Sequence, residues 1–147
     1  MIKKTSAGVL IFYLKNNNPI FLLLEYSNYW GFVKGLIEDN ETETDTAKRE
    51  AKEEANLSDI TMISGFRHII NYFFKWDGDI VSKQVIFLLG KVNKEQAEKV
   101  KISFEHQDFK WLNFDEAIKI VKHNNEKELL IKADTFIKEY LKQRRLE

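Results

Sequence analysis

Residues 35–57 read GLIEDNETETDTAKREAKEEANL, and the rest of the chain is interpreted outward from them. Glu50, Glu53 and Glu54 stand at i, i+3 and i+4, so a helix would project all three carboxylates from one face. Like charges at this spacing repel by about 0.2–0.5 kcal/mol per pair. A solvated helix rich in lysine and glutamate can carry such a triplet without any function. The alternative is a site for a hard cation that prefers oxygen ligands, Mg²⁺ or Mn²⁺.

The flanking residues predict a short helix within this stretch, over about residues 45–55. Ala47 and Ala51 lie four positions apart and, with Leu57, are expected to face a sheet while the glutamates face a cleft. Polar residues suited to the N-cap precede the helix: Thr42, Thr44 and Asp45.

The stretch resembles the Nudix box, G-x5-E-x7-R-E-U-x-E-E-x-G-U, where U is aliphatic. One defined position differs: Asn56 stands where the family has glycine. The glycine ends the helix in a left-handed conformation, for which asparagine is the next best residue. The matching residues are Gly35, Glu41, Arg49, Glu50, Ala51, Glu53, Glu54 and Leu57. The resemblance implies that Glu41 and Arg49 support the loop and helix rather than take part in the chemistry.

Length and composition fit one soluble domain, 1–147. The 147 residues include 23 basic and 23 acidic side chains, so zero net charge argues against an extended nucleic-acid track or an anionic membrane surface. No stretch approaches the roughly 20 apolar residues of a membrane span. Without cysteine, disulfides and thiolate metal sites are excluded, which fits the cytoplasm. We expect a monomer or a weak dimer.

The order of elements predicts an α/β fold. Residues 5–14 form a strand buried on both faces, and a turn at 16–19 leads to a second strand, 20–26. Asp77-Gly78 joins two β-type runs, 60–76 and 80–92. Residues 109–112 give the last strand. A helix over 114–122, broken by Asn124 and Asn125, precedes a final amphipathic helix over 126–141. The resemblance implies a Nudix α/β/α sandwich with a mixed central sheet and a catalytic loop-helix-loop.

Three features outside the box resemble the Nudix branch that cleaves dinucleoside polyphosphates asymmetrically. The first is Trp30-Gly-Phe-Val-Lys34-Gly35, with Val33 where that branch usually has proline. The second is Asn71-Tyr72 with Lys83 on the next strand, where the resemblance implies base stacking and phosphate contact. The third is Glu105-His106-Gln107 before Trp111. Here the resemblance implies that the glutamate reaches across to the metal cluster. Phe136 packs in the core by its helical spacing, and it also aligns with an aromatic that closes over the base.

These features imply hydrolysis of diadenosine tetraphosphate to ATP and AMP by a water activated on a magnesium cluster. Alternatives are trimming of RNA 5′-triphosphate ends, hydrolysis of another nucleoside diphosphate derivative, or a non-catalytic nucleotide sensor. Sensors of this type usually lack box glutamates, which this chain keeps. Which glutamate is the general base stays open. The implied site is metal-binding at Glu50, Glu53, Glu54 and Glu105, catalytic at Glu53, Glu54 and Glu105, and substrate-binding at Lys34, Gly35, Tyr72, Lys83 and Phe136.

Overall fold

A computed structural model describes residues 2–146, with side chains for residues 3–144. Within this range, eight strands form one mixed sheet. They are β1 (Ile2–Lys15), β2 (Asn18–Glu25), β3 (Trp30–Gly31), β4 (Val33–Leu36), β5 (Thr61–Met62), β6 (His68–Trp76), β7 (Asp79–Lys91) and β8 (Asp108–Asn113). The helices are α1 (Glu43–Ala55), α2 (Lys94–Ala97), α3 (Phe114–Ile120) and α4 (Asn124–Leu146).

Strand β1 lies at the centre of the sheet. It pairs antiparallel with β2 and β4, and parallel with β7 along eleven residues. Alternate side chains of β1 enter different cores: Leu10 and Phe12 pack beneath α3 and α4, whereas Val9 and Ile11 pack beneath α1. The prediction of a strand buried on both faces is therefore confirmed.

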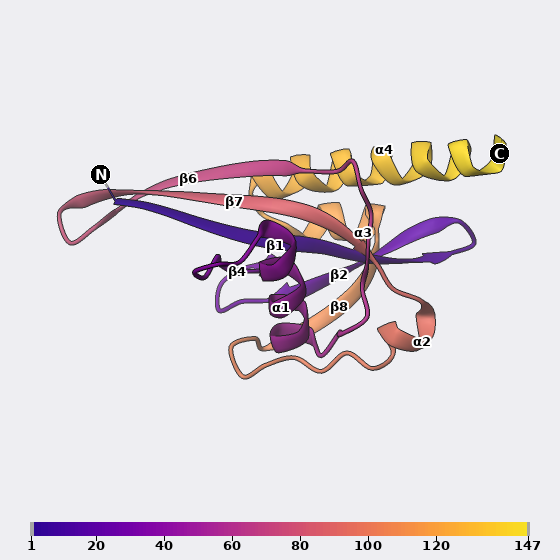
Figure 1. The fold of residues 1–147 in the computed structure, drawn as a ribbon, viewed down its shortest axis with the longest axis horizontal. Coiled ribbons are helices and arrows are strands. Elements are labelled where there is room, and N and C mark those ends of the chain that lie inside the picture. The colour runs from indigo at the N-terminus through magenta and orange to yellow at the C-terminus, as the bar shows by residue number, and fades with distance from the viewer. Residues whose placement is uncertain (1, 147) are drawn as a thin grey trace.

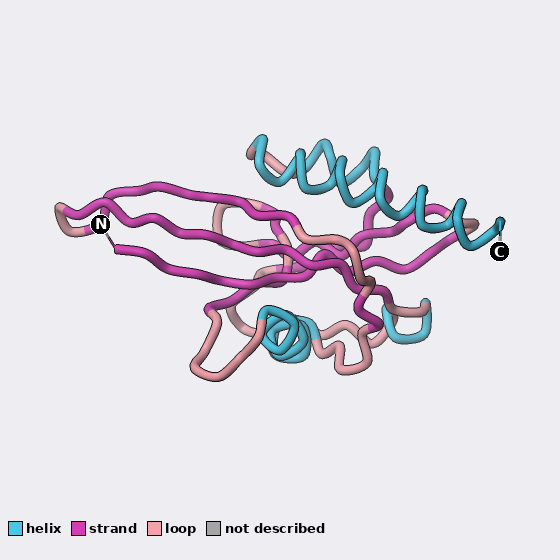
Figure 2. Tube along the Cα trace, turned by 45° about the horizontal axis from the view of Figure 1, so that its top comes forward, coloured by secondary structure: helices cyan, strands magenta, loops and turns pink. Residues whose placement is uncertain are grey.

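Helices cover both faces of the sheet, as Figures 1 and 2 show. Helix α4 crosses one face, with α3 beside it, and α1 lies against the other. This α/β/α arrangement confirms the predicted fold class. None of the helices described is long and apolar enough to cross a membrane.

The β6–β7 hairpin extends far from the helices, to the left in Figure 1. Asp77 and Gly78 form its turn with φ of 50° and 82°, as the sequence predicted, and Trp76 pairs with Asp79. The run 60–76 does not form one long strand, however. It divides into β5 and β6, with Gly65 between them at φ 95°, a conformation that glycine adopts freely.

The predicted boundaries of three helices were wrong, and the helix predicted over 114–122 ends at Ile120. Helix α1 begins at Glu43 rather than 45, because Thr42 is the N-cap and forms a capping box with Asp45. Asn124 and Asn125 do not break helical structure. The break lies before them, after Ile120, and α4 then runs from Asn124 to Leu146, beyond both predicted ends of 126 and 141.

Candidate active site

Helix α1 packs its small residues on the sheet and directs Glu50 and Glu54 towards strand β4. Ala47 and Ala51 are fully buried, and Leu57 is nearly so. The helix ends at Asn56, whose φ of 59° and ψ of 35° are the left-handed conformation that the sequence predicted there. Close packing of two alanines against β1 and β4 brings the other face of the helix to the edge of strand β4.

Arg49 joins α1 to the loop before it. Its Nε and Nη2 donate to the two carboxylate oxygens of Glu41, at 2.7 and 3.0 Å. Nη1 donates to Glu50 at 2.7 Å, and Nη2 also donates to the Leu36 carbonyl at 2.9 Å. These bonds lower the pKa of Glu41 to about 2, with Arg49 as the largest cause. Such contacts favour the predicted supporting role of both residues.

An acidic cavity of about 330 Å³ opens beside the helix. Gly35 lies in its wall on β4, and a side chain at that position would overlap the Glu50 carboxylate. Glycine is therefore needed for Glu50 to approach the strand. The cavity is lined by Lys34, Gly35, Glu50, Glu53, Glu54, Ser103, Phe104 and Glu105. All four glutamates that the sequence proposed as metal ligands thus meet in one cavity.

The loop that carries Glu105 is attached to the end of α1. The Lys101 N–H donates to the Ala55 carbonyl and the Ser103 N–H to the Glu54 carbonyl, each at 3.2 Å. These bonds satisfy carbonyls that the last turn of a helix leaves free. They also hold Glu105 near the glutamates of α1, although 51 positions separate it from Glu54 in the chain.

Glu54 is the most deeply buried carboxyl group of the cavity, with 4% of its surface exposed. One oxygen accepts the Lys34 backbone N–H at 3.1 Å, and the other lies 3.3 Å from His106 Nε2. Burial, followed by repulsion from Glu50, raises the pKa of Glu54 to about 8. A buried carboxyl group beside further carboxylates is the environment that a cation would stabilise in its ionised form.

Oxygen and nitrogen donors are grouped closely enough to hold such a cation. Ligand atoms of Glu54, Glu105 and His106 lie within 4.8 Å of one another. His106 is buried, burial lowers its pKa, and its ring meets Tyr26 edge-on at 4.6 Å. From the sequence, this neutral imidazole was not among the expected metal ligands. The donor set fits a divalent metal ion, which Nudix enzymes generally use.

A second cavity, of about 270 Å³, shares Lys34 with the first. The Lys34 ammonium lies 4.3 Å from the centre of the Tyr26 ring and donates to the Tyr29 hydroxyl at 3.4 Å. The lining residues are Tyr29, Lys34, Tyr72, Phe74, Lys83, His123 and Glu126. Lys34, Tyr72 and Lys83, which the sequence assigned to substrate, therefore lie in one cavity.

Positive charge gathers at the second cavity, around Lys83. Burial lowers the pKa of Lys83, and the neighbouring Lys34 and Lys4 lower it further. Lys4 and Lys83 are partners in the β1–β7 register and so project from the same face of the sheet. Ammonium groups that destabilise one another in this way favour binding of a polyanion.

Phe136 does not join Tyr72. It packs against Phe66 with ring centres 5.5 Å apart, next to Gly65, and lines neither cavity. The core position predicted for it is confirmed, but its position gives no support to a role in closing over a base. The aromatic rings that line the second cavity besides Tyr72 belong to Tyr29, Phe74 and His123.

Sequence reasoning missed several residues of the site: Tyr26, Tyr29, His123, Glu126 and Lys4. They come from strand ends, loops and the start of α4, and no fixed spacing connects them. Phe74 of the second cavity was missed as well. The alternation of β6 was the one signal that could have found it, since it places Phe74 on the same face as Tyr72.

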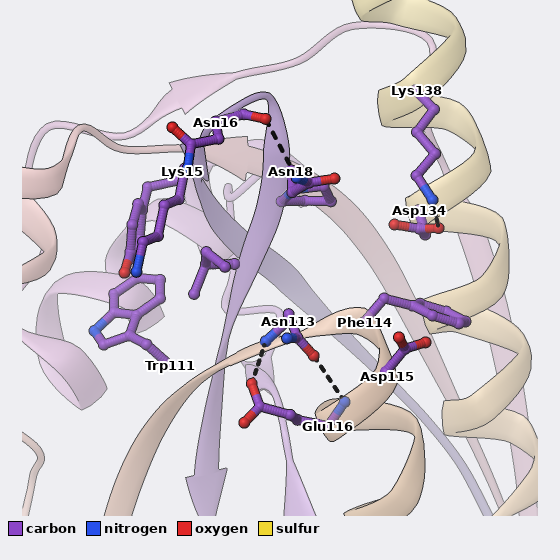
Figure 3. A pocket seen from close by; sticks show the side chains of 13 residues that line it. Lys15, Asn16, Asn18, Trp111, Asn113, Phe114, Asp115, Glu116, Asp134 and Lys138 are labelled. Atoms are coloured by element: carbon purple, nitrogen blue, oxygen red, sulfur yellow. Dashed lines mark hydrogen bonds and ion pairs between the residues drawn. The ribbon is translucent and has the colours of Figure 1, made fainter.

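A larger cavity, of about 500 Å³, lies away from these residues between the β1–β2 turn, the start of α3 and α4. Figure 3 shows Asp134 and Lys138 of α4 facing Asn16 and Asn18 of the turn. Asp134 is paired with Lys138 at 2.9 Å. None of the residues assigned to the site from the sequence lines this cavity.

The NUDIX domain family model matches residues 4–133. The asymmetrical bis(5′-nucleosyl)-tetraphosphatase of Sus scrofa is 37% identical over 122 residues, 80% of each chain. A crystal structure of the Caenorhabditis elegans Ap4A hydrolase, a binary complex, superimposes with a TM-score of 0.79 at 32% identity, covering 91% of this chain and 97% of that one. The dihydroneopterin triphosphate diphosphatase of Haemophilus influenzae is 26% identical over 141 residues, 88% of this chain and 87% of its own. With a family model that spans most of its length, this chain belongs to the NUDIX family and is a Nudix hydrolase.

Proposed function

We propose that this protein hydrolyses dinucleoside polyphosphates, and diadenosine tetraphosphate in particular, to ATP and AMP. The observation that carries the proposal is the junction at Lys34 of an acidic cavity with an aromatic and basic one. A nucleoside joined to a chain of phosphates needs both environments: the aromatic and basic cavity suits the nucleoside, and the acidic cavity suits phosphates that carry a cation. The tetraphosphatase activity named for the pig and nematode relatives supports the same substrate class.

Glu50, Glu53, Glu54 and Glu105 would hold Mg²⁺, or Mn²⁺ in its place. Bound there, the cation supplies charge neutralisation for the phosphates and lowers the pKa of a nearby water. Lys34 and Lys83 hold the phosphate chain and offset the negative charge that develops on the leaving group. Tyr72 stacks on the adenine. We propose the cytoplasm as the compartment that provides the nucleotide.

The general base that fits the geometry best is Glu105. Both oxygens of Glu54 have neighbours, and the Glu53 carboxylate accepts a hydrogen bond from Arg49 Nη1 at 3.2 Å. Glu105 makes no ion pair or side-chain hydrogen bond with the rest of residues 3–144. A general base needs one oxygen free to take a proton from water within hydrogen-bond reach, even where its other oxygen holds the cation.

Product analysis tests the reaction. Diadenosine tetraphosphate, dihydroneopterin triphosphate and a 5′-triphosphorylated oligonucleotide are each incubated with Mg²⁺ or with EDTA, and the products are separated by chromatography. We expect ATP and AMP from the first, only with Mg²⁺, and slow turnover of the others. A preference for dihydroneopterin triphosphate or for the oligonucleotide would retain the carboxylate chemistry and contradict the substrate.

A variant tests the base. Glu105→Gln should reduce kcat by about 100-fold or more, because removing a general base costs roughly 10²–10⁴ in rate. The matched control is Glu98→Gln, at the exposed C-cap of helix α2, and it should leave kcat unchanged. A Glu105 variant with normal kcat would assign the base to Glu53 or Glu54.

A further inference from the structure

Glu126, in the first turn of α4, is a buried acidic residue that the proposed chemistry does not use. Only 5% of its surface is exposed, and it lines the cavity that contains Tyr72 and Lys83. Its Oε1 accepts the Tyr72 hydroxyl at 2.6 Å. Its Oε2 is buried and has no hydrogen-bond partner among the described side chains.

A buried oxygen without a partner is costly, because it has lost its hydration and gained nothing in return. Such groups are rare in folded proteins, and a missing ligand is one explanation. The same cavity holds the ammonium groups of Lys34 and Lys83, yet neither bonds Oε2. The unfilled acceptor therefore calls for a donor from a bound molecule.

The position of Glu126 indicates which part of that molecule reaches it. Because Glu126 accepts a bond from the hydroxyl of Tyr72, it lies at the tip of the Tyr72 ring rather than over its face. A planar base stacked on Tyr72 and Phe74 would have its edge, not its face, beside Glu126. The negative charge of a phosphate would be repelled by Glu126 and attracted to Lys34 and Lys83. The base therefore lies next to Glu126 and the phosphates next to the lysines.

We propose that Glu126 is a specificity-determining residue that accepts a hydrogen bond from the exocyclic amino group of an adenine stacked on Tyr72. The inference rests on the proposed function and names the part of the substrate that this subsite recognises. A carboxylate oxygen accepts an N–H from a base edge well, and sites built to bind such a group discriminate against analogues that lack it. Tyr72 then stacks on the base while its hydroxyl holds Glu126 in place.

The test compares diadenosine tetraphosphate with the analogue in which purine replaces adenine, so that hydrogen replaces the amino group. For the unaltered protein we expect kcat/KM for the adenine substrate to exceed that for the analogue by about tenfold or more, mainly through KM. Glu126→Gln keeps an oxygen for Tyr72 but lacks the acceptor for the base, so the ratio should fall towards one. Glu128→Gln is the control: it lies on the same helix with 57% of its side chain exposed, and it should keep the full ratio.

Binding separates failure of this inference from failure of the proposed reaction. Calorimetry compares AMP with purine riboside 5′-monophosphate, without any turnover. If no dinucleotide is hydrolysed but AMP binds about tenfold more tightly, the reaction is wrong and the subsite stands. Equal affinities for the two monophosphates, or a Glu126→Gln variant that discriminates as well as the parent, would overturn the role of Glu126. The measurement on the unaltered protein decides even if the variant does not fold.

Discussion

Glu54 has to be ionised to bind a cation but is buried where ionisation is unfavourable. Its pKa of about 8 lies above the ordinary 4.5 because of burial and the nearby Glu50. A cation in the cavity would reverse this preference, since it stabilises the ionised form. Uptake of the metal should then release a proton at neutral pH. Because metal binding competes with protonation of Glu54, the affinity for the metal should depend on pH.

Glu54→Gln should abolish catalysis and still stabilise the metal-free protein at alkaline pH. A carboxyl group with a raised folded-state pKa contributes stability below about 4.5, and this contribution is lost as pH rises through about 8. Glutamine cannot ionise and keeps an oxygen for the Lys34 N–H. Thermal unfolding in EDTA should show the variant gaining on the parent between about pH 4.5 and 8, while kcat falls about 100-fold or more.

Two outcomes would contradict that interpretation. A variant with near-normal activity would remove Glu54 from the metal ligands. Unfolding temperatures of variant and parent that change in parallel with pH would show that Glu54 does not titrate in this range. Glu53→Gln offers a comparison for the pH experiment, because the Glu53 side chain is 58% exposed and remains on the same face of α1.

At the scale of elements, α1 depends on how it starts and stops. Its start involves reciprocal bonds between Thr42 and Asp45, and its end a left-handed Asn56. The N–H groups of Asn56 and Leu57 bond the Lys52 and Ala51 carbonyls, at 3.0 and 3.2 Å. The chain can then turn into the core directly after the helix.

Replacing Asn56 tests the cost of that turn. Asn56→Ala should lower the free energy of unfolding by about 1–2 kcal/mol, because alanine lacks the short polar side chain that lets asparagine adopt the left-handed conformation. Asn56→Gly should be neutral or slightly stabilising, because glycine is unstrained there. Both variants should keep normal KM in steady-state assays. Urea unfolding provides the measurement, and equal stability of the two variants would be inconsistent with the left-handed conformation.

Local sequence was sufficient for the loop-helix-loop but not for the second cavity. Glutamate spacing, the capping residues and Asn56 are all local signals, and each located part of α1 to within two residues. Tyr29 belongs to the loop before β3, whereas His123 and Glu126 lie at the start of α4, and these two segments meet only when α4 packs on the sheet. For Phe136, helical spacing correctly predicted packing against the core. It did not predict that the ring would contact Phe66, because that contact depends on how α4 packs on the sheet.

Across the whole molecule, the charges of this neutral chain are sorted into regions. Glu50, Glu53, Glu54 and Glu105 gather on one side of Lys34, and Lys83 and Lys4 on the other. A substrate that carries both a chelated cation and free phosphate oxygens suits such a division. Net charge alone could not reveal it, since the two signs cancel in the sum.

Salt should therefore weaken substrate binding despite the zero net charge. KM for diadenosine tetraphosphate is expected to rise between about 0.05 and 0.5 M KCl, because the Debye screening length falls from ~10 Å to a few Å over this range. Lys83→Met should raise KM about tenfold and reduce its salt dependence. Lys75→Met, on the outward face of β6, should have no effect on either. A KM that does not change with salt would mean that the lysines do not contact the phosphates.

The long pairing of β1 with β7 also has a consequence for how the protein is made. Ile2 pairs with Val81 and Phe12 with Lys91, so each pair joins residues 79 positions apart. At a synthesis rate of roughly 5–20 residues per second, about 4–16 seconds pass between synthesis of the apolar strand β1 and synthesis of its parallel neighbour β7. Until β7 emerges, β1 can form only its hairpin with β2 and its pairing with β4. The growing chain is thus exposed to chaperones and to misassembly until well over half of it has been translated.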